Sequence, residues 1–170
     1  MIIEGPIIKY ERDNINTDEI IPARYLSTSD PEELAAHCME DLDIDFLKTK
    51  ADTGAEILVT GANMGCGSSR EHAPIAIKHA GIKAVVAPSF ARIFFRNSIN
   101  MGLPIFECKD ADFYQETVQG DRLRIDADEG TIENETSGKT YPIQKMPEFL
   151  QNLIQSGGLL QFARELLAEK

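Results

Sequence analysis

Residues 61–74 read Gly-Ala-Asn-Met-Gly-Cys-Gly-Ser-Ser-Arg-Glu-His-Ala-Pro, and this stretch predicts a tight connection between a strand and a helix. Its three glycines allow the backbone to turn sharply or to approach a ligand closely. Pro74 fits a helix only in the first turn, where its missing N–H has no intrahelical partner. We therefore expect a helix that begins near residues 70–73 and stops at Gly81.

Ser68 and Ser69 fall in the loop before this helix, and Arg70 stands near its start. Exposed backbone N–H groups at a helix start, a guanidinium and free hydroxyl oxygens together favour a small anion, such as the carboxylates of an organic acid. A second interpretation stays open here. Ser68 and Glu71 have the spacing of a capping box, in which Ser68 has only a structural role.

Two strand–loop–helix units in the middle of the chain indicate a partly parallel sheet with helices packed on it. The first unit has its strand at 56–60, and the second joins a strand at 83–87 to a helix at 90–101. A hairpin at 121–143 adds antiparallel strands. The other expected elements are a strand at 2–10, a loop at 19–29, a helix at 30–40 with a capping box from Asp30 to Glu33, a strand at 104–107, and a tail helix from Pro147 interrupted at 157–158. The sequence thus predicts one α/β domain over residues 1–170, with a mixed sheet.

The charge of the chain is strongly negative overall but unevenly distributed. A net charge of -11 argues against nucleic-acid binding, which needs basic patches. Residues 61–104 nevertheless carry five basic side chains and one acidic one, a local net charge of +4. A glycine loop inside this cationic segment suits an anionic ligand, although Lys78 and Lys83 fit equally well as solvated residues of a helix face.

The sequence also limits location and cofactor chemistry. No apolar run approaches the roughly 20 residues of a membrane span, and residues 1–6 lack the basic and apolar regions of a signal peptide. We expect a cytoplasmic protein with neither a membrane nor a nucleic-acid partner. Cys38, Cys66 and Cys108 are widely spaced without a C-x-x-C motif, so they predict neither a disulfide framework nor a metal site in this chain.

Three sequence words carry a family resemblance: Asn-Thr-Asp-Glu-Ile-Ile-Pro at 16–22, Gly-Cys-Gly-Ser-Ser-Arg-Glu-His-Ala-Pro at 65–74 and Ser-Phe-Ala-Arg-Ile-Phe-Phe-Arg-Asn at 89–97. In this order and spacing they resemble the small subunits of 3-isopropylmalate dehydratases, in the aconitase superfamily, over nearly the whole chain. The resemblance implies the swivelling β/β/α domain of aconitases as a separate chain. It also implies a large-subunit partner, in a heterodimer or heterotetramer, whose three cysteines hold a [4Fe–4S] cluster. No cofactor is expected on this chain itself.

The resemblance further implies a hydro-lyase of leucine biosynthesis. It would move a hydroxyl group between adjacent carbons of 2-isopropylmalate by dehydration and rehydration. Ser68 is then the catalytic base, as an alkoxide, which needs positive surroundings that Arg70, the loop amides and the helix start can supply. Arg70 is the arginine that binds a substrate carboxylate, since its planar fork suits bidentate contacts, and Ser69 adds a hydrogen bond.

The segment Arg24-Tyr-Leu-Ser-Thr28 is expected to contact the substituent beyond the malate-like core of the substrate. Its candidate substrate-binding residues are Arg24, Ser27 and Thr28. Leu26 and the two small hydroxyl residues favour an alkyl group, whereas Arg24 is compatible with a core carboxylate or with a third one. The small subunit of a homoaconitase or of a 2,3-dimethylmalate dehydratase is therefore the alternative within the family.

Two alternatives lie outside this chemistry. One is a non-catalytic anion- or nucleotide-binding module, although the glycine loop matches neither a Walker A motif nor G-x-G-x-x-G. The other is a non-catalytic subunit that keeps the fold, against which the intact Ser68, Ser69 and Arg70 argue.

Overall fold

The computed structural model describes residues 1–169, through which runs a seven-stranded mixed sheet of order β4-β3-β2-β1-β5-β6-β7. Four strands are parallel: β1 (Ile2–Lys9), β2 (Ile57–Val59), β3 (Ala84–Ala87) and β4 (Ile105–Glu107). Strands β2 and β3 are buried along their whole length. They therefore read as continuous apolar runs instead of alternating patterns, as strands covered on both faces do.

Strand β1 belongs to both halves of the sheet. Its residues Ile2 to Pro6 pair antiparallel with β5 (Arg122–Asp126), and Ile7 to Lys9 pair parallel with β2. The antiparallel half continues through β6 (Thr131–Asn134) and β7 (Lys139–Pro142). Buried residues alternate with more exposed ones along β5 and β6, so this half has one face on the core and one toward solvent.

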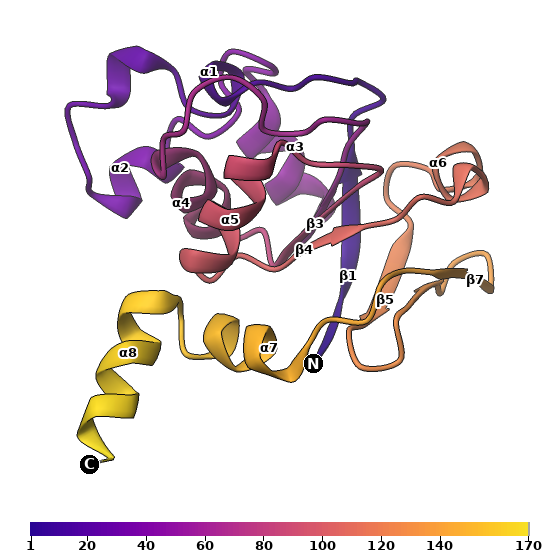
Figure 1. The fold of residues 1–170 in the computed structure, drawn as a ribbon. Helices are drawn as coiled ribbons and strands as arrows, with labels where there is room; N and C mark the ends of the chain where they lie inside the picture. The colour runs from indigo at the N-terminus through magenta and orange to yellow at the C-terminus, as the bar shows by residue number, and fades with distance from the viewer. Residues whose placement is uncertain (170) are drawn as a thin grey trace.

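Helices connect the strands and follow the last one. They are α1 (Thr17–Ile20), the 3-10 turn η1 (Ala23–Tyr25), α2 (Pro31–Ala35), α3 (Phe46–Thr53), α4 (His72–His79), α5 (Arg92–Asn100), α6 (Ala111–Glu116), α7 (Glu148–Gln155) and α8 (Leu159–Ala168). Helix α4 packs against α1, α2 and α5, and α5 also contacts α7. In Figure 1, α4 and α5 lie to the left of the parallel strands, α6 and the antiparallel strands lie at the right, and α8 projects at the lower left.

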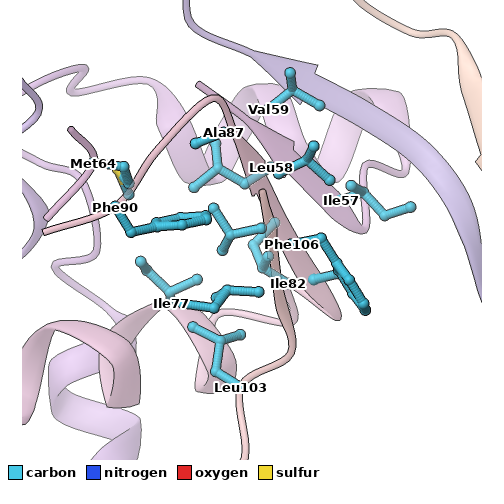
Figure 2. Close-up of a cluster of buried hydrophobic side chains, with 14 of the residues drawn as sticks. Ile57, Leu58, Val59, Met64, Ile77, Ile82, Ala87, Phe90, Leu103 and Phe106 are labelled. Carbon is cyan, nitrogen blue, oxygen red and sulfur yellow. The ribbon is translucent and has the colours of Figure 1, made fainter. Parts of the chain in front are cut away.

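The core extends from the parallel strands toward α4 and the loops at the sheet edge. Figure 2 shows Leu58 of β2 and Ile77 of α4 in one cluster with Phe90 and Met64. These four side chains are at most 9% exposed, and burying a side chain of this size stabilises a fold by about 1.5–3 kcal/mol. Because Met64 follows β2 and Phe90 follows β3, the cluster also fixes the two loops that leave this end of the sheet.

The mixed α/β sheet is confirmed, but helix also occurs where none was expected. Helix α1 and η1 overlap the loop expected at 19–29. A capping box that the sequence analysis missed begins α1: Asn16 accepts from the Glu19 N–H, and the Glu19 carboxylate accepts from the Asn16 N–H. Helix α6 was also not expected, although Asp110 caps it by accepting from a backbone N–H. The predicted domain boundary at Lys170 lies outside the described residues.

The helix expected at 30–40 is shorter than predicted, because α2 ends at Ala35. Asp30 caps it as predicted, but the reciprocal half of the capping box is not made, since the Asp30 N–H donates to Thr28 Oγ1 at 3.0 Å. Met39 adopts a positive φ of 63° and donates its N–H to the last residue of α1. This left-handed backbone prevents the helix from reaching the predicted end.

Candidate active site

The connections after β1, β2 and β3 meet at the carboxyl edge of the parallel strands, where open α/β sheets commonly bind ligands. Backbone hydrogen bonds join them. The Thr17 N–H donates to the Cys66 carbonyl at 2.8 Å, and the Met64 N–H donates to the Ser89 carbonyl at 3.1 Å. Each of these connections carries one of the three sequence words, so the fold brings all three words together.

Two of the loop glycines are required by the backbone, as the sequence predicts. Gly65 has a φ of +82°, and a Cβ there would lie 2.5 Å from Cβ of Phe94. Gly67 has a φ of +104°, and a Cβ there would lie 3.1 Å from Oγ1 of Thr17. Other residues adopt these positive φ values only with strain, so the loop can pass close to α1 and α5 only because glycine stands at both positions.

Ser68 is exposed, and its side-chain oxygen has two polar neighbours from this chain. Arg70 Nε donates to Ser68 Oγ at 2.6 Å, and Thr17 Oγ1 lies 3.2 Å from the same oxygen. The Ser68 N–H donates to Thr17 Oγ1 at 3.1 Å. A guanidinium that donates to a hydroxyl oxygen stabilises negative charge on it, so these contacts favour the ionised form of Ser68.

Arg70 is held on several sides, with its side chain only 15% exposed. Besides the bond to Ser68, its Nη1 donates to the Ile21 carbonyl at 3.2 Å and pairs with Asp18 Oδ1 at 2.8 Å. Within residues 1–169, Nη2 makes no hydrogen bond, so one end of the fork remains for a ligand. The guanidinium therefore has a fixed orientation before any substrate binds.

Ser69 is exposed beside Ser68, and its carbonyl accepts a hydrogen bond of 2.9 Å from Asn97 Nδ2. Asn97 lies on α5 and is 4% exposed. A buried amide that bonds to a loop carbonyl restrains the backbone there. Asn97, in the third sequence word, thus restrains the backbone of the second word at Ser69.

The capping-box interpretation of Ser68 is wrong. Helix α4 begins at His72, as expected, but its N-cap residue is Glu71 and no side chain caps it. Ser68 lies three residues before that cap and directs its hydroxyl to Thr17 and Arg70. The positive group beside the Ser68 oxygen is therefore the Arg70 guanidinium, while the helix start lies further along the chain.

The loop forms an open surface instead of a closed pocket. A cleft of about 530 Å³ opens near the carboxyl ends of β1 and β2 and includes Lys9, Thr60 and Tyr114 in its wall. Ser68, Ser69 and Arg70 do not line this cleft. Ser68 and Ser69 are both exposed at the surface of the molecule.

Arg24 does not join Ser68 and Arg70 in this structure. Its guanidinium pairs bidentately with Asp41, at 2.9 and 2.7 Å, and reaches Glu40 at 3.3 Å. The hydrogen bond from Arg24 lowers the pKa of Asp41, and that from His37 lowers the pKa of Glu40. The positive charge of Arg24 is thus already balanced by two carboxylates.

Ser27 and Thr28 lie in the connection between η1 and α2, which is part of the purple segment at the upper left of Figure 1. Ser27 is exposed, and Thr28 Oγ1 accepts the Asp30 N–H near the start of α2. Neither contacts Ser68 or Arg70. Of the substrate-binding residues that the sequence predicts, the structure brings together Ser69 and Arg70 with Ser68, and leaves these two and Arg24 apart.

The two lysines of the cationic segment have structural partners. Lys78 Nζ donates to the Met101 carbonyl at 2.9 Å and to the Gly157 carbonyl at 3.3 Å, and burial lowers its pKa. Lys83 pairs with Glu56 at 2.9 Å. The two lysines therefore bind groups of the fold itself, and the cation at the glycine loop is Arg70.

The cysteines occupy separate positions. Cys38 and Cys108 are buried, and burial raises the pKa of both thiols. Cys66 is half-buried in the glycine loop. Among residues 1–169 no three His, Cys, Asp or Glu side chains gather closely enough to bind a metal ion. In the same part of the chain, no helix has the length and apolar character needed to cross a membrane.

Three further residues of the sequence words contact the Ser68 loop, although the sequence analysis gave them no role. Thr17 and Asp18 belong to the first sequence word and contact Ser68 and Arg70, respectively. Asn97 ends the third word. The available signal was that all three are polar residues inside the words that carry the resemblance.

Comparison with known proteins agrees with this arrangement. The family model of the aconitase C-terminal domain matches residues 2–110. The 3-isopropylmalate dehydratase small subunit of Nautilia profundicola is 56% identical over 99% of this chain and 98% of its own length. The protein of the same name from Ruminiclostridium cellulolyticum is 52% identical over 99% of this chain and its full length.

A crystal structure of 3-isopropylmalate dehydratase from Methanocaldococcus jannaschii has the same fold. It superposes with a TM-score of 0.86 at 43% identity and covers 99% of this chain and 98% of that one. The sequence identity of more than one half over the full length and the matching fold show that the similarity is not confined to the three words. The chain belongs to the family of 3-isopropylmalate dehydratase small subunits, which share the aconitase C-terminal domain.

Proposed function

We propose that this chain is the small subunit of a 3-isopropylmalate dehydratase, a hydro-lyase that interconverts 2-isopropylmalate and 3-isopropylmalate in leucine biosynthesis. The observation that carries the proposal is the 2.6 Å hydrogen bond from Arg70 Nε to Ser68 Oγ, on a loop held by all three sequence words. The full-length relatives that bear this name support it. A cytoplasmic location is part of the proposal.

In this function Ser68 is the base. Its hydroxyl loses its proton to solvent, and the resulting alkoxide takes a proton from the substrate carbon next to the one that bears the hydroxyl group. On rehydration, Ser68 returns a proton to the other of these two carbons. Arg70 supports the alkoxide through Nε and offers Nη2 to a substrate carboxylate, while the exposed Ser69 donates a further hydrogen bond.

A second chain is needed to complete the site. Ser68 and Ser69 are exposed, and among residues 1–169 no three cysteines or other metal-binding side chains gather in one place. We propose that a large subunit holds the [4Fe–4S] cluster, which would supply Lewis-acid chemistry for the departure of the hydroxyl group. This chain then contributes the base, the carboxylate-binding arginine and half of the enclosure.

The geometry favours an alkyl substituent over a third carboxylate. Arg24 is the cation of the 24–28 segment, and Glu40 and Asp41 already neutralise it. A third carboxylate would compete with these two for the same guanidinium. Leu26 is partly buried. Because Ser27 and Thr28 lie apart from Ser68 in this structure, the proposal includes an approach of the 24–28 segment to the isopropyl group when the large subunit is bound.

The decisive experiment reconstitutes this chain with its large subunit under anaerobic conditions and assays 2-isopropylmalate, 2,3-dimethylmalate and homocitrate. We expect 2-isopropylmalate to be preferred and neither subunit to be active alone. Ser68→Ala should lose activity at least about 1,000-fold, as removal of a catalytic base or nucleophile does. Ser137→Ala, in the exposed turn between β6 and β7, is the matched control and should retain it.

Each contrary outcome has a separate meaning. Preference for homocitrate would refute the alkyl pocket and favour a homoaconitase. Activity that survives in Ser68→Ala would exclude Ser68 as the base. Failure of the wild-type complex on all three substrates would refute the proposed function.

A further inference from the structure

Thr17 provides a second polar group at the Ser68 oxygen, and it comes from a different part of the chain. Its Oγ1 lies 3.2 Å from Ser68 Oγ and accepts the Ser68 N–H at 3.1 Å. The two residues are 51 positions apart in the sequence. Thr17 is 1% exposed, whereas Ser68 is exposed. The buried hydroxyl thus lies on the protein side of the loop, away from solvent.

The direction of the hydrogen bond follows from a count of donors and acceptors. A hydroxyl has one hydrogen to donate. Thr17 uses a lone pair for the Ser68 N–H, so its own hydrogen is free, and Ser68 Oγ is the polar atom that the structure gives it. When Ser68 has lost its proton, its oxygen can only accept. Thr17 must then be the donor, and the hydrogen bond becomes charge-assisted and stronger than in the neutral state.

The position of Thr17 is fixed by its surroundings. It is the first residue of α1, whose capping box joins Asn16 and Glu19, and its N–H donates to the Cys66 carbonyl at 2.8 Å. Its β-branched side chain has few rotamers. Gly67 passes directly over it, since a Cβ at that position would lie 3.1 Å from Thr17 Oγ1. The hydroxyl is therefore oriented before any substrate arrives.

We infer that Thr17 is a positioning residue for the reaction, because its hydroxyl donates to the Ser68 alkoxide and, with Arg70 Nε, stabilises it. Two groups then hold the alkoxide, the Arg70 guanidinium and the buried Thr17 hydroxyl, and a lone pair of Ser68 Oγ stays exposed to accept the substrate proton. This inference rests on the proposed role of Ser68.

Two variants separate the hydroxyl of Thr17 from its shape. Thr17→Val keeps the branched side chain and removes the hydroxyl, whereas Thr17→Ser keeps the hydroxyl and removes the methyl group. A hydrogen bond to a charged group is worth about 1.5–3 kcal/mol, so Thr17→Val should lower kcat of the reconstituted complex roughly 10- to 100-fold. KM should change by less than about threefold, since no substrate contact is lost. Thr17→Ser should stay within about threefold of the wild type.

The pH profile and amide exchange distinguish this role from simple packing. In Thr17→Val the alkoxide is harder to form, so the kcat deficit should be largest at low pH and shrink as the pH rises through the ionisation of Ser68. In the same complex, hydrogen exchange of the Ser68 amide should speed up in Thr17→Val, which lacks the acceptor, and stay slow in Thr17→Ser. Circular dichroism checks that both variants are folded.

The inference is overturned if Thr17→Val keeps wild-type kcat, or if Thr17→Ser is the more damaging variant. The first result, with Ser68→Ala inactive, would refute the role of Thr17 and leave the proposed function intact. The second would mean that the methyl group and its packing matter. An inactive wild-type complex would overturn both proposals.

Discussion

Gly65 offers a sharp test of how closely the glycine loop packs against α5. In Gly65→Ala, the positive φ of 82° costs about 1–2 kcal/mol for a residue with a Cβ. The new Cβ would also lie 2.5 Å from Cβ of Phe94, an atom that no rotamer change can move away. Overpacking of this kind costs about 1–3 kcal/mol. The free energy of unfolding should therefore fall by about 2–5 kcal/mol, a large part of the roughly 5–15 kcal/mol of a typical domain.

Gly138 supplies the matched control, because its φ is +77° and nothing lies within 4 Å of a Cβ built there. Gly138→Ala thus carries the backbone strain without the overlap, and the loss of unfolded-chain freedom is the same in both variants. Urea unfolding followed by circular dichroism measures the two free energies, with a common m value as the check that the unfolded states match. Gly65→Ala should be less stable than Gly138→Ala by about 1–3 kcal/mol. Agreement of the two within about 0.5 kcal/mol would refute the reasoning.

Three other expectations concern the surroundings of the site. The hydrogen bond from Arg24 lowers the pKa of Asp41, so their ion pair is fully formed above about pH 4 and opens as the pH falls through the lowered pKa. Amide exchange over residues 22–41 should then rise in acid. Asp41→Asn should remove this pH dependence. Lys78→Met removes two hydrogen bonds to backbone carbonyls and should lower Tm by about 2–4 °C. Lys83→Met, at an exposed ion pair, should leave Tm within error. Equal shifts of Tm in the two variants would contradict this difference. Helix α8 contributes no buried residue, so a chain that ends at residue 158 should unfold with a free energy lowered by less than about 2 kcal/mol, and a larger loss would show that α8 is integral to the core.

The elements that sequence analysis predicted well are those with strong local signals. The buried strands β2 and β3 are continuous apolar runs, and the position of Pro74 correctly indicated that α4 begins within 70–73. The predictions failed where a distant contact overrode a local pattern. The helix expected at 30–40 ends early because the backbone of Met39 bonds to the end of α1, which no pattern within 30–40 reveals.

The candidate site divides in the same way. The sequence indicated Ser68, Ser69 and Arg70 as a unit, because a glycine-rich loop with hydroxyls and a guanidinium suits an anion. It could not decide between a base and a helix cap at Ser68. The tertiary structure excludes the helix cap, since Oγ contacts Arg70 and a residue of α1 while the helix begins further along the chain. The roles of Ser68 and Ser69 in catalysis stay predictions.

Residue type and short-range spacing by themselves determined which segments form buried strands, where glycine permits a positive φ, and which loop carries the polar groups. These properties depend on local backbone sterics and on burial, so they are readable along the chain. Only the tertiary structure decided which groups touch. It placed Thr17 against Ser68 and Asn97 against Ser69 across 51 and 28 residues, and it directed Arg24 to Asp41 instead of to the loop. Hydrogen bonds of a few ångströms between such distant residues depend on the order in which β1, β2 and β3 pair, and that order is set by the packing of the whole sheet.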